Sequence, residues 1–117
     1  MNEIVVMFEV TIKESKKDDY LKMAASLKEN LEKAEGFIRS ERFSSLSAPN
    51  KLLSISVWKD EESIAKWRND TEHRLCQKQG RENYFADYKI TVVKPIRTYT
   101  MEKRQNAPKD SNEYLGE

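Results

Sequence analysis

The stretch from Leu52 to Arg74, LLSISVWKDEESIAKWRNDTEHR, constrains the fold of this chain more than any other. Its first seven residues alternate, which is the period-two pattern of a strand with one apolar face. Asp60 follows as a helix N-cap, and the two glutamates after it suit the positive end of a helix dipole. Ile64 and Trp67 then recur at helical spacing. We therefore predict a strand that passes through a capped turn into an amphipathic helix.

Period-two alternation also marks three other segments. Residues 4–12 have one strongly apolar face and predict the first strand. Residues 37–47 are more polar, and a short turn joins them to the strand at 52–58, which predicts an antiparallel hairpin. Residues 88–101 predict the last strand, with a bulge or an edge at Pro95 because proline cannot donate a ladder hydrogen bond. Its second half is expected to pair with another subunit. Residues 82–88, ENYFADY, read as an aromatic connector that leads into this strand.

Two helical patterns lie between these strands. Ser15, with Asp18 three residues later, resembles a capping box and predicts the start of an amphipathic helix that ends at a glycine C-cap, Gly36. The second helix begins after Asp60. We expect residues 69–71, Asn-Asp-Thr, to interrupt and restart it, because these side chains compete for backbone hydrogen bonds.

The resulting order is strand, helix, strand, strand, helix, strand. It predicts an α+β, ferredoxin-like βαββαβ fold with an antiparallel sheet and both helices on one side. We expect Val5, Met7 and Leu52 on the uncovered face, which a second copy of the chain would protect. Residues 1–102 are expected to form the domain, and residues 103–117 a polar C-terminal tail.

Composition narrows the classes of partner. The net charge is only +1 although 35% of the residues are charged, so there is no electrostatic argument for nucleic acid or an anionic membrane. No apolar run approaches the roughly 20 residues that span a bilayer. The N-terminus lacks the features of a signal peptide. The single cysteine, Cys76, cannot form an internal disulfide, which suits a reducing cytoplasm. We expect a cytoplasmic protein with no nucleic-acid or membrane partner.

Two runs carry a family resemblance, SLSAPNKLLSISVWKDEESIAKWRNDTEHR and GRENYFADYKITVVKPIRTY. In the first, a strand-end tryptophan (Trp58) is followed by acidic residues, a helical tryptophan (Trp67) and a histidine (His73). Over about residues 3–101 the chain resembles the antibiotic biosynthesis monooxygenase (ABM) domain family of the dimeric α+β barrel superfamily. The resemblance implies a homodimer around a shared α/β barrel. It also implies a pocket in each subunit, between the sheet and the helices.

The resemblance implies three possible functions. One branch oxygenates anthrones or quinols with O2 and uses no metal or organic cofactor, a second degrades haem, and a third has no demonstrated chemistry. The haem-degrading branch uses a first-strand asparagine, where this chain has Phe8, and a histidine ligand, where it has Gln77. His73 comes a full turn too early to be that ligand, and only Trp67 matches. Haem degradation is therefore the lower-ranked enzymatic function.

His73 and Trp67 are the candidate catalytic residues. A cofactor-free oxygenase needs a base that makes an electron-rich phenolate or enolate, and His73 is the only histidine and titrates near neutral pH. It lies just after residues 69–71, where a surface or structural role is the alternative. Trp67 would form a pocket wall, with a core tryptophan as the alternative.

Four further residues are candidates for substrate binding. Phe8, Trp58 and Phe85 would line an aromatic pocket, and Arg42 would hold an oxyanion or carboxylate through its planar donor fork. The alternatives are plain core positions and an exposed ion pair. One histidine and one cysteine three residues apart do not form a metal site, and the glycines are scattered. We expect no metal and no cofactor.

Two hypotheses follow from these residues. The first is a cofactor-independent monooxygenase that acts on a small electron-rich aromatic, such as a quinol, an anthrone or a polyketide phenol. The second is a non-enzymatic homodimer that binds a small hydrophobic ligand. Oxygen consumption with a reduced quinol or anthrone would separate the two.

Overall fold

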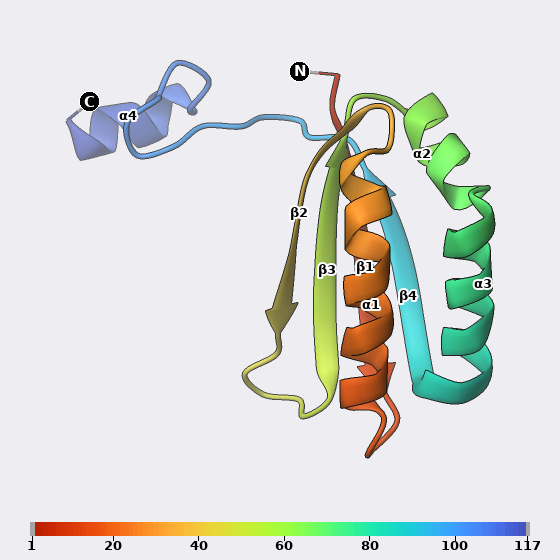
Figure 1. Ribbon diagram of the computed structural model, residues 1–117. Coiled ribbons are helices and arrows are strands. Elements are labelled where there is room, and N and C mark those ends of the chain that lie inside the picture. Colours follow the sequence, from red (N-terminus) through yellow and green to blue (C-terminus); the bar gives the residue numbers. More distant parts are fainter. Residues whose placement is uncertain (1, 117) are drawn as a thin grey trace.

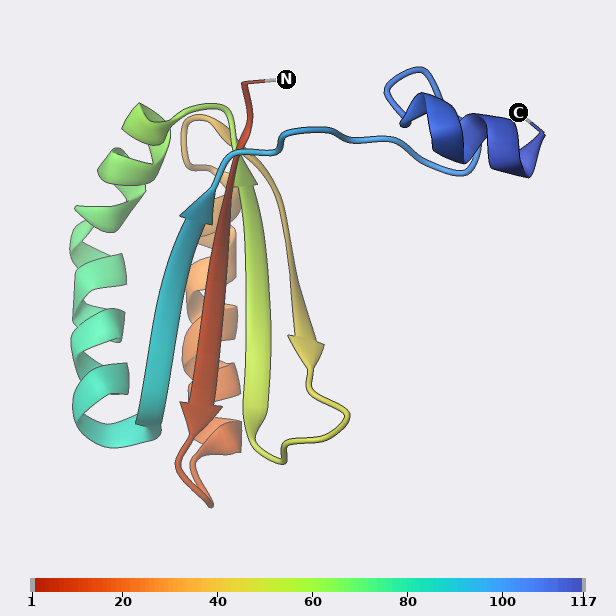
Figure 2. The same cartoon turned by 180° about the vertical axis from the view of Figure 1, so that it is seen from behind.

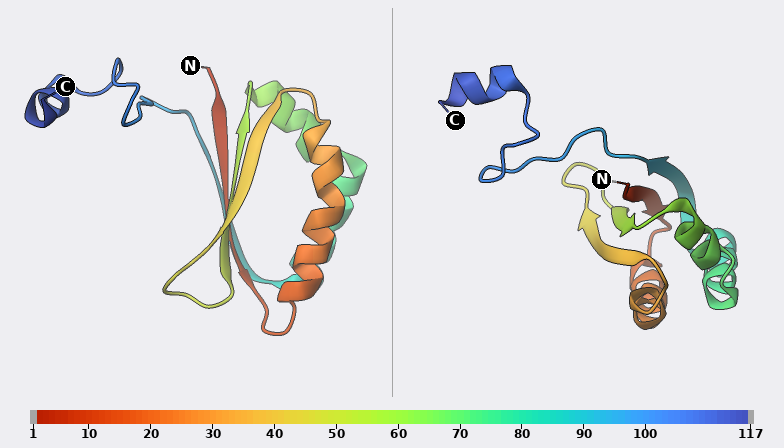
Figure 3. Two further views of the ribbon diagram at one scale, coloured as in Figure 1. Left: turned by 60° about the vertical axis from the view of Figure 1, so that its left-hand side comes forward. Right: turned by 90° about the horizontal axis from the view of Figure 1, so that it is seen from above.

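A four-stranded antiparallel sheet carries helices on one of its faces (Figures 1 and 3). The computed structural model describes residues 2–116, and in the third helix it leaves out the side chains of residues 71 and 72. None of the helices in this described part is both long and apolar enough to cross a bilayer. The elements in chain order are β1 (Ile4–Ile12), α1 (Lys17–Glu32), β2 (Phe37–Ser44), β3 (Lys51–Trp58), α2 (Glu61–Arg68), α3 (Thr71–Gln79), the π-helical turn η1 (Gly80–Tyr84), β4 (Phe85–Val93) and α4 (Lys109–Leu115).

The strand order is β2-β3-β1-β4, with β1 at the centre. Phe8 of β1 pairs with Ser54 of β3 on one side and with Ile90 of β4 on the other. Seen from the side, α1, α2 and α3 form a layer on one face of the sheet, and Figure 2 shows the opposite face without helices over it. The predicted α+β, ferredoxin-like fold is confirmed.

The core lies between the sheet and α1. Val10, Ile12, Tyr20 and Leu52 are each at most 5% exposed and pack together. Leu52 was expected on the uncovered face, and that prediction is wrong. Leu52 pairs directly with Val10, and residues that pair across antiparallel strands point to the same face.

The other face of the sheet, here called the open face, is partly apolar. Val5, Met7 and Ile55 lie on it, half-buried, and the placement of Val5 and Met7 agrees with the sequence. Three of its charged residues form ion pairs, since Glu9 of β1 lies 3.7 Å from Lys51 of β3 and 3.3 Å from Lys89 of β4.

Helix α1 begins differently from the prediction. Ser15 has φ of 72°, a left-handed conformation, and the residue before the helix, Lys16, forms no side-chain cap. The predicted capping box is therefore not formed, because an N-cap residue needs an extended backbone. The helix ends at Glu32 rather than at Gly36, and Gly36 instead supplies a turn with φ of 80°.

The predictions for α2 and α3 are confirmed. The Asp60 carboxylate accepts hydrogen bonds from Ser63 N at 2.8 Å and from Ser63 Oγ at 2.7 Å. These bonds lower the pKa of Asp60, and they cap α2. The helix ends at Arg68, and Asp70 caps α3 by accepting a hydrogen bond from His73 N at 3.1 Å. The interruption falls within residues 69–71, as predicted.

Two strands have other bounds than predicted. β2 ends at Ser44, three residues early, and β4 spans Phe85–Val93, so it includes residues that were expected to be a connector. β4 ends before Pro95, and the chain then runs away from the sheet to α4 (Figure 1). This segment exposes large apolar side chains, including Ile96 at 90% and Met101 at 85%. Its pairing with a second subunit stays a prediction.

Candidate functional site

A close contact between Gly36 and Ser63 fixes helix α2 against the sheet. A Cβ at Gly36 would lie 1.9 Å from Ser63 Oγ, so only glycine allows this approach. Lys59 N also donates a hydrogen bond to Gly36 O at 2.7 Å, which joins the end of β3 to the same turn. The start of α2 is thereby held at the end of β3, and this placement directs Trp67 towards the sheet.

This placement brings four rings together, here called the Trp67 cluster: those of Phe37, Trp58, Trp67 and His73. Phe37 lies edge-on to Trp58 with ring centres 5.4 Å apart, and Trp58 lies 6.3 Å from Trp67. Trp67 stacks at 4.8 Å on the imidazole of His73, with 31° between the ring planes. Trp58 is 1% exposed and its Nε1 donates a hydrogen bond to Ser56 Oγ at 2.9 Å. The two candidate catalytic residues are therefore in contact, beside one of the candidate binding residues.

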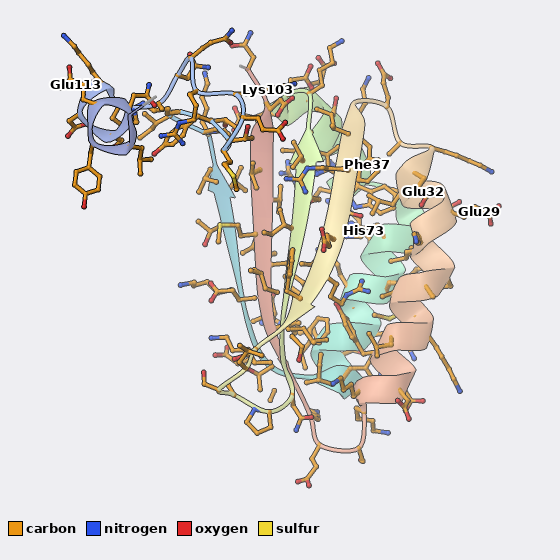
Figure 4. The ribbon with its side chains drawn as sticks, turned by 90° about the vertical axis from the view of Figure 1, so that its left-hand side faces the viewer. Glu29, Glu32, Phe37, His73, Lys103 and Glu113 are labelled. Carbon is orange, nitrogen blue, oxygen red and sulfur yellow. The ribbon has the colours of Figure 1, made fainter. Side chains whose placement is uncertain are left out.

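His73 does not have the surface position that was considered for it. Figure 4 shows its side chain, like that of Phe37, between the sheet and the helix layer. Burial lowers the pKa of His73, while the charge of Asp70 and hydrogen bonding of the ring with the backbone of Trp67 and Arg68 act in the opposite direction. At neutral pH the imidazole is therefore uncharged. Its Nδ1 is buried and has no hydrogen-bond partner among the described residues. A buried ring nitrogen without a partner is unusual and marks a position that can serve a ligand.

A second group of rings, the Phe85 cluster, consists of Phe8, Tyr20, Phe85 and Tyr88. The Phe85 ring centre lies 5.7 Å from that of Phe8 and 5.6 Å from that of Tyr20. Gly80 in η1 makes room for it, since a Cβ there would lie 2.4 Å from the Phe85 ring. The guanidinium of Arg42 lies 5.7 Å from the centre of the Tyr20 ring. The other three candidate binding residues thus meet at this cluster.

Small and half-exposed side chains separate the two clusters. Phe8 pairs with Ser54, and Trp58 lies four residues further along β3, about 13 Å away. Ser54 and Ser56 lie between them on the helix-facing side. On the same side of β4, Ile90 is 46% and Val92 is 49% exposed. The helix layer therefore leaves apolar sheet surface accessible between the Trp67 and Phe85 clusters.

Two hollows in the surface lie elsewhere. One of about 290 Å³ is on the open face, between β2, β3 and β1, and includes Met7 and Phe43 in its lining. The other, about 440 Å³, lies at the start of β4 and includes Arg81 and Phe85. Neither is lined by Trp67 or His73. Only the second borders a candidate binding residue.

The positions compared with haem-degrading proteins do not form a haem site. Phe8 belongs to the Phe85 cluster, whereas Trp67 belongs to the other cluster. Gln77, at the position of the histidine ligand, is exposed on α3. The single histidine is packed against Trp67, and these residues do not fit a haem ligand set.

Sequence reasoning missed Tyr20, Phe37 and Ser56. Tyr20 lies on the apolar stripe of α1 and is 5% exposed. Its hydroxyl is the only feature of the sequence that distinguishes it from the other residues of that stripe. Phe37 and Ser56 become relevant only through their contacts with Trp58. The pattern of one strand does not indicate which residues of another strand or helix meet it.

Comparison with known proteins assigns the family. Residues 3–79 match the antibiotic biosynthesis monooxygenase family. A curated relative, jasmonate monooxygenase ABM of Pyricularia oryzae, is 40% identical over 87 residues, which are 74% of this chain and 40% of that protein. The uncharacterized protein YqjZ of Bacillus subtilis is 27% identical over 59 residues, 50% of this chain and 52% of that protein. The chain thus spans about half or less of the length of these relatives.

Solved structures share the fold. A conserved protein from Methanosarcina mazei has a TM-score of 0.75 and 23% identity, covering 80% of this chain and 93% of that one. SnoaB, a cofactor-independent oxygenase from Streptomyces nogalater, has a TM-score of 0.73 and 13% identity, covering 84% and 97%. With the family match over residues 3–79, these findings show that the chain belongs to the antibiotic biosynthesis monooxygenase family.

Proposed function

We propose that this protein is a cofactor-independent monooxygenase that uses O2 to oxidise a small electron-rich aromatic, such as a quinol, an anthrone or a polyketide phenol. One observation carries the proposal: the neutral imidazole of His73 is stacked on Trp67 and has a buried, unpartnered Nδ1. Family membership supports the reaction type. The description of SnoaB as a cofactor-independent oxygenase supports the absence of a cofactor.

The chemical role of His73 is that of a base. The imidazole accepts the hydroxyl proton of a phenol or enol, and the resulting anion is rich enough in electrons to transfer one to O2. The two radicals combine to a peroxide anion, which takes back the proton from the imidazolium to give a hydroperoxide, and the hydroperoxide then loses water. For an anthrone the ring CH2 becomes C=O, so one oxygen atom enters the product and the other leaves as water. The four electrons that reduce O2 come from the two C–H bonds.

The lowered pKa of His73 suits this role. A base must be unprotonated before the substrate binds, and burial keeps the imidazole neutral at neutral pH. Trp67 offers a flat apolar surface on which an aromatic ring can stack beside the base. Excluding water from this layer protects a carbanion-like intermediate from reprotonation. In this proposal the half-exposed Ile90 and Val92 form the rest of the surface that the substrate covers.

We further propose that the protein works as a homodimer joined through the open face. Apolar side chains at Val5, Met7 and Ile55 support this, because a monomer would leave them partly exposed beside an unprotected sheet edge. The exposed Ile96 and Met101 after β4 would pack on the second subunit in the same assembly.

Oxygen uptake with anthrone tests the proposed reaction. The rate is measured in a buffer treated with a chelator, above the spontaneous rate, for the wild type, His73→Ala and Trp67→Phe. Gln77→Ala is the matched control, because Gln77 is exposed on the same helix as His73. We expect loss of at least about 100-fold for His73→Ala, about tenfold for Trp67→Phe, and an unchanged rate for the control. No protein-dependent uptake with a broad panel of quinols and anthrones would refute the proposed function.

A further inference from the structure

Arg42 differs from every other strand residue that faces the helices. Its partner in the sheet is Ser54, which shares a face with Phe8 and therefore with the helix layer. Charged residues of the sheet, such as Glu9, Lys51 and Lys89, lie on the open face instead. The remaining helix-facing residues in the register of the described strands are uncharged: Ile4, Val6, Phe8, Val10, Ile12, Phe37, Ser40, Ser44, Leu52, Ser54, Ser56, Trp58, Phe85, Tyr88, Ile90 and Val92.

The charge of Arg42 is not neutralised. On the open face, Glu9 lies within 3.7 Å of Lys51 and 3.3 Å of Lys89. Within the described part of the chain, Arg42 has no carboxylate at ion-pair distance, and its neighbour is the ring of Tyr20 at 5.7 Å. A cation beside an apolar cluster without a counter-charge attracts an anion more strongly than one that is already paired.

Tyr20 completes the arrangement as a neutral donor. It is 5% exposed, and burial raises its pKa, although the charge of Arg42 and hydrogen bonding with Arg42 act in the opposite direction. Its hydroxyl therefore stays protonated at neutral pH and can donate a hydrogen bond. The same ring packs on Phe85 at 5.6 Å. A guanidinium fork and a hydroxyl thus stand beside the aromatic rings of the Phe85 cluster.

We propose that Arg42 and Tyr20 bind the carboxylate of the substrate, which makes the substrate an elongated aromatic acid. This inference rests on the proposed function, because it places the reacting ring near His73 and the acid at the opposite end of the same surface. Arg42 pairs with Ser54, about 13 Å along β3 from Trp58. The planar guanidinium forms two parallel hydrogen bonds with a carboxylate, which fixes the direction in which the molecule lies.

A pair of ligands that differ only in charge tests this inference. The acid is 6-hydroxy-2-naphthoate, whose phenol and carboxylate lie at opposite ends of a flat ring system, and its neutral counterpart is the corresponding amide. Both are titrated by calorimetry in the absence of oxygen. We expect the wild type to bind the acid at least about tenfold more tightly than the amide.

Three variants assign the preference to the proposed residues. Arg42→Gln keeps a long polar side chain and is expected to bind the acid and the amide equally. Tyr20→Phe keeps the ring and is expected to reduce the preference about threefold. Arg39→Gln is the matched control, since Arg39 lies on the same strand but pairs with Val57 on the open face, and it should keep the wild-type preference.

The outcomes separate this inference from the proposed function. A preference for the acid that survives in Arg42→Gln, or a wild type that binds the two ligands equally or binds neither, would overturn the inference. In that case oxygen uptake with neutral phenols would still support the proposed function. An Arg42-dependent preference for the acid in a protein without any oxygen uptake would instead refute the proposed function alone. Unchanged circular dichroism of Arg42→Gln shows that a lost preference does not come from unfolding.

Discussion

Replacing Gly36 by alanine tests how helix α2 is positioned. Gly36 has φ of 80°, a conformation that costs a residue with a Cβ about 1–2 kcal/mol. The new Cβ would also lie 1.9 Å from Ser63 Oγ and 2.4 Å from Ser63 Cβ. Ser63 is 6% exposed and hydrogen-bonded to Asp60, so it cannot rotate away freely. Overpacking of this kind costs about 1–3 kcal/mol, which gives a total of about 2–5 kcal/mol for Gly36→Ala.

Urea unfolding measures this cost, and a second substitution divides it into its two parts. Ser63→Gly removes the atoms that clash, so the double variant should recover about 1–3 kcal/mol relative to the sum of the single changes. Gly116→Ala is the control for backbone strain, because Gly116 also has a positive φ, 74°, but no atom lies within 4 Å of its new Cβ. A cost below about 1 kcal/mol for Gly36→Ala, or no recovery with Ser63→Gly, would refute the reasoning.

Three further changes have defined outcomes. Burial lowers the pKa of His73 below the ordinary value of about 6.5 that it has when unfolded, so the unfolded chain binds the proton first as the pH falls. The wild type should therefore lose stability as the pH falls from about 6.5 to below the lowered pKa. Urea unfolding over the same pH range should show a smaller loss of stability for His73→Gln. Gly80→Ala places a Cβ 2.4 Å from the ring of Phe85 and should lower the free energy of unfolding by about 1–3 kcal/mol, whereas the same change combined with Phe85→Leu should cost less. Ile55→Glu puts a charge on the open face and should yield a monomer in sedimentation velocity where the wild type is a dimer; a monomeric wild type at micromolar concentration would contradict the proposed assembly.

Local features of the sequence predict local structure well in this chain. Asp60 caps α2 because an aspartate directly before a helical pattern can accept a hydrogen bond from the backbone of the first turn. The interruption at residues 69–71 follows from side chains that bond to the backbone. Trp67 and His73 are both predicted from the same stretch of sequence. They are six residues apart across this interruption, and their ring centres lie 4.8 Å apart.

Other features depend on contacts between distant segments. Ser15 has the right type and spacing for a capping box, but the turn after β1 holds it at φ of 72°. Alternation in β3 shows that Leu52 and Leu53 face opposite sides, and only the pairing with Val10 decides which side is the core. The division of the candidate residues into two clusters is likewise set by sheet register. No pattern within a single strand or helix encodes it.

The most direct test of the proposed oxygenation is the origin of the oxygen atom that enters the product. Anthrone is incubated under isotopically labelled O2, in buffer treated with a chelator, with the wild type and with His73→Gln. The proposed mechanism predicts anthraquinone that carries one labelled oxygen for each O2 consumed, formed well above the spontaneous rate by the wild type and at the spontaneous rate with His73→Gln. Equal rates for the two proteins, or product without the label, would contradict it.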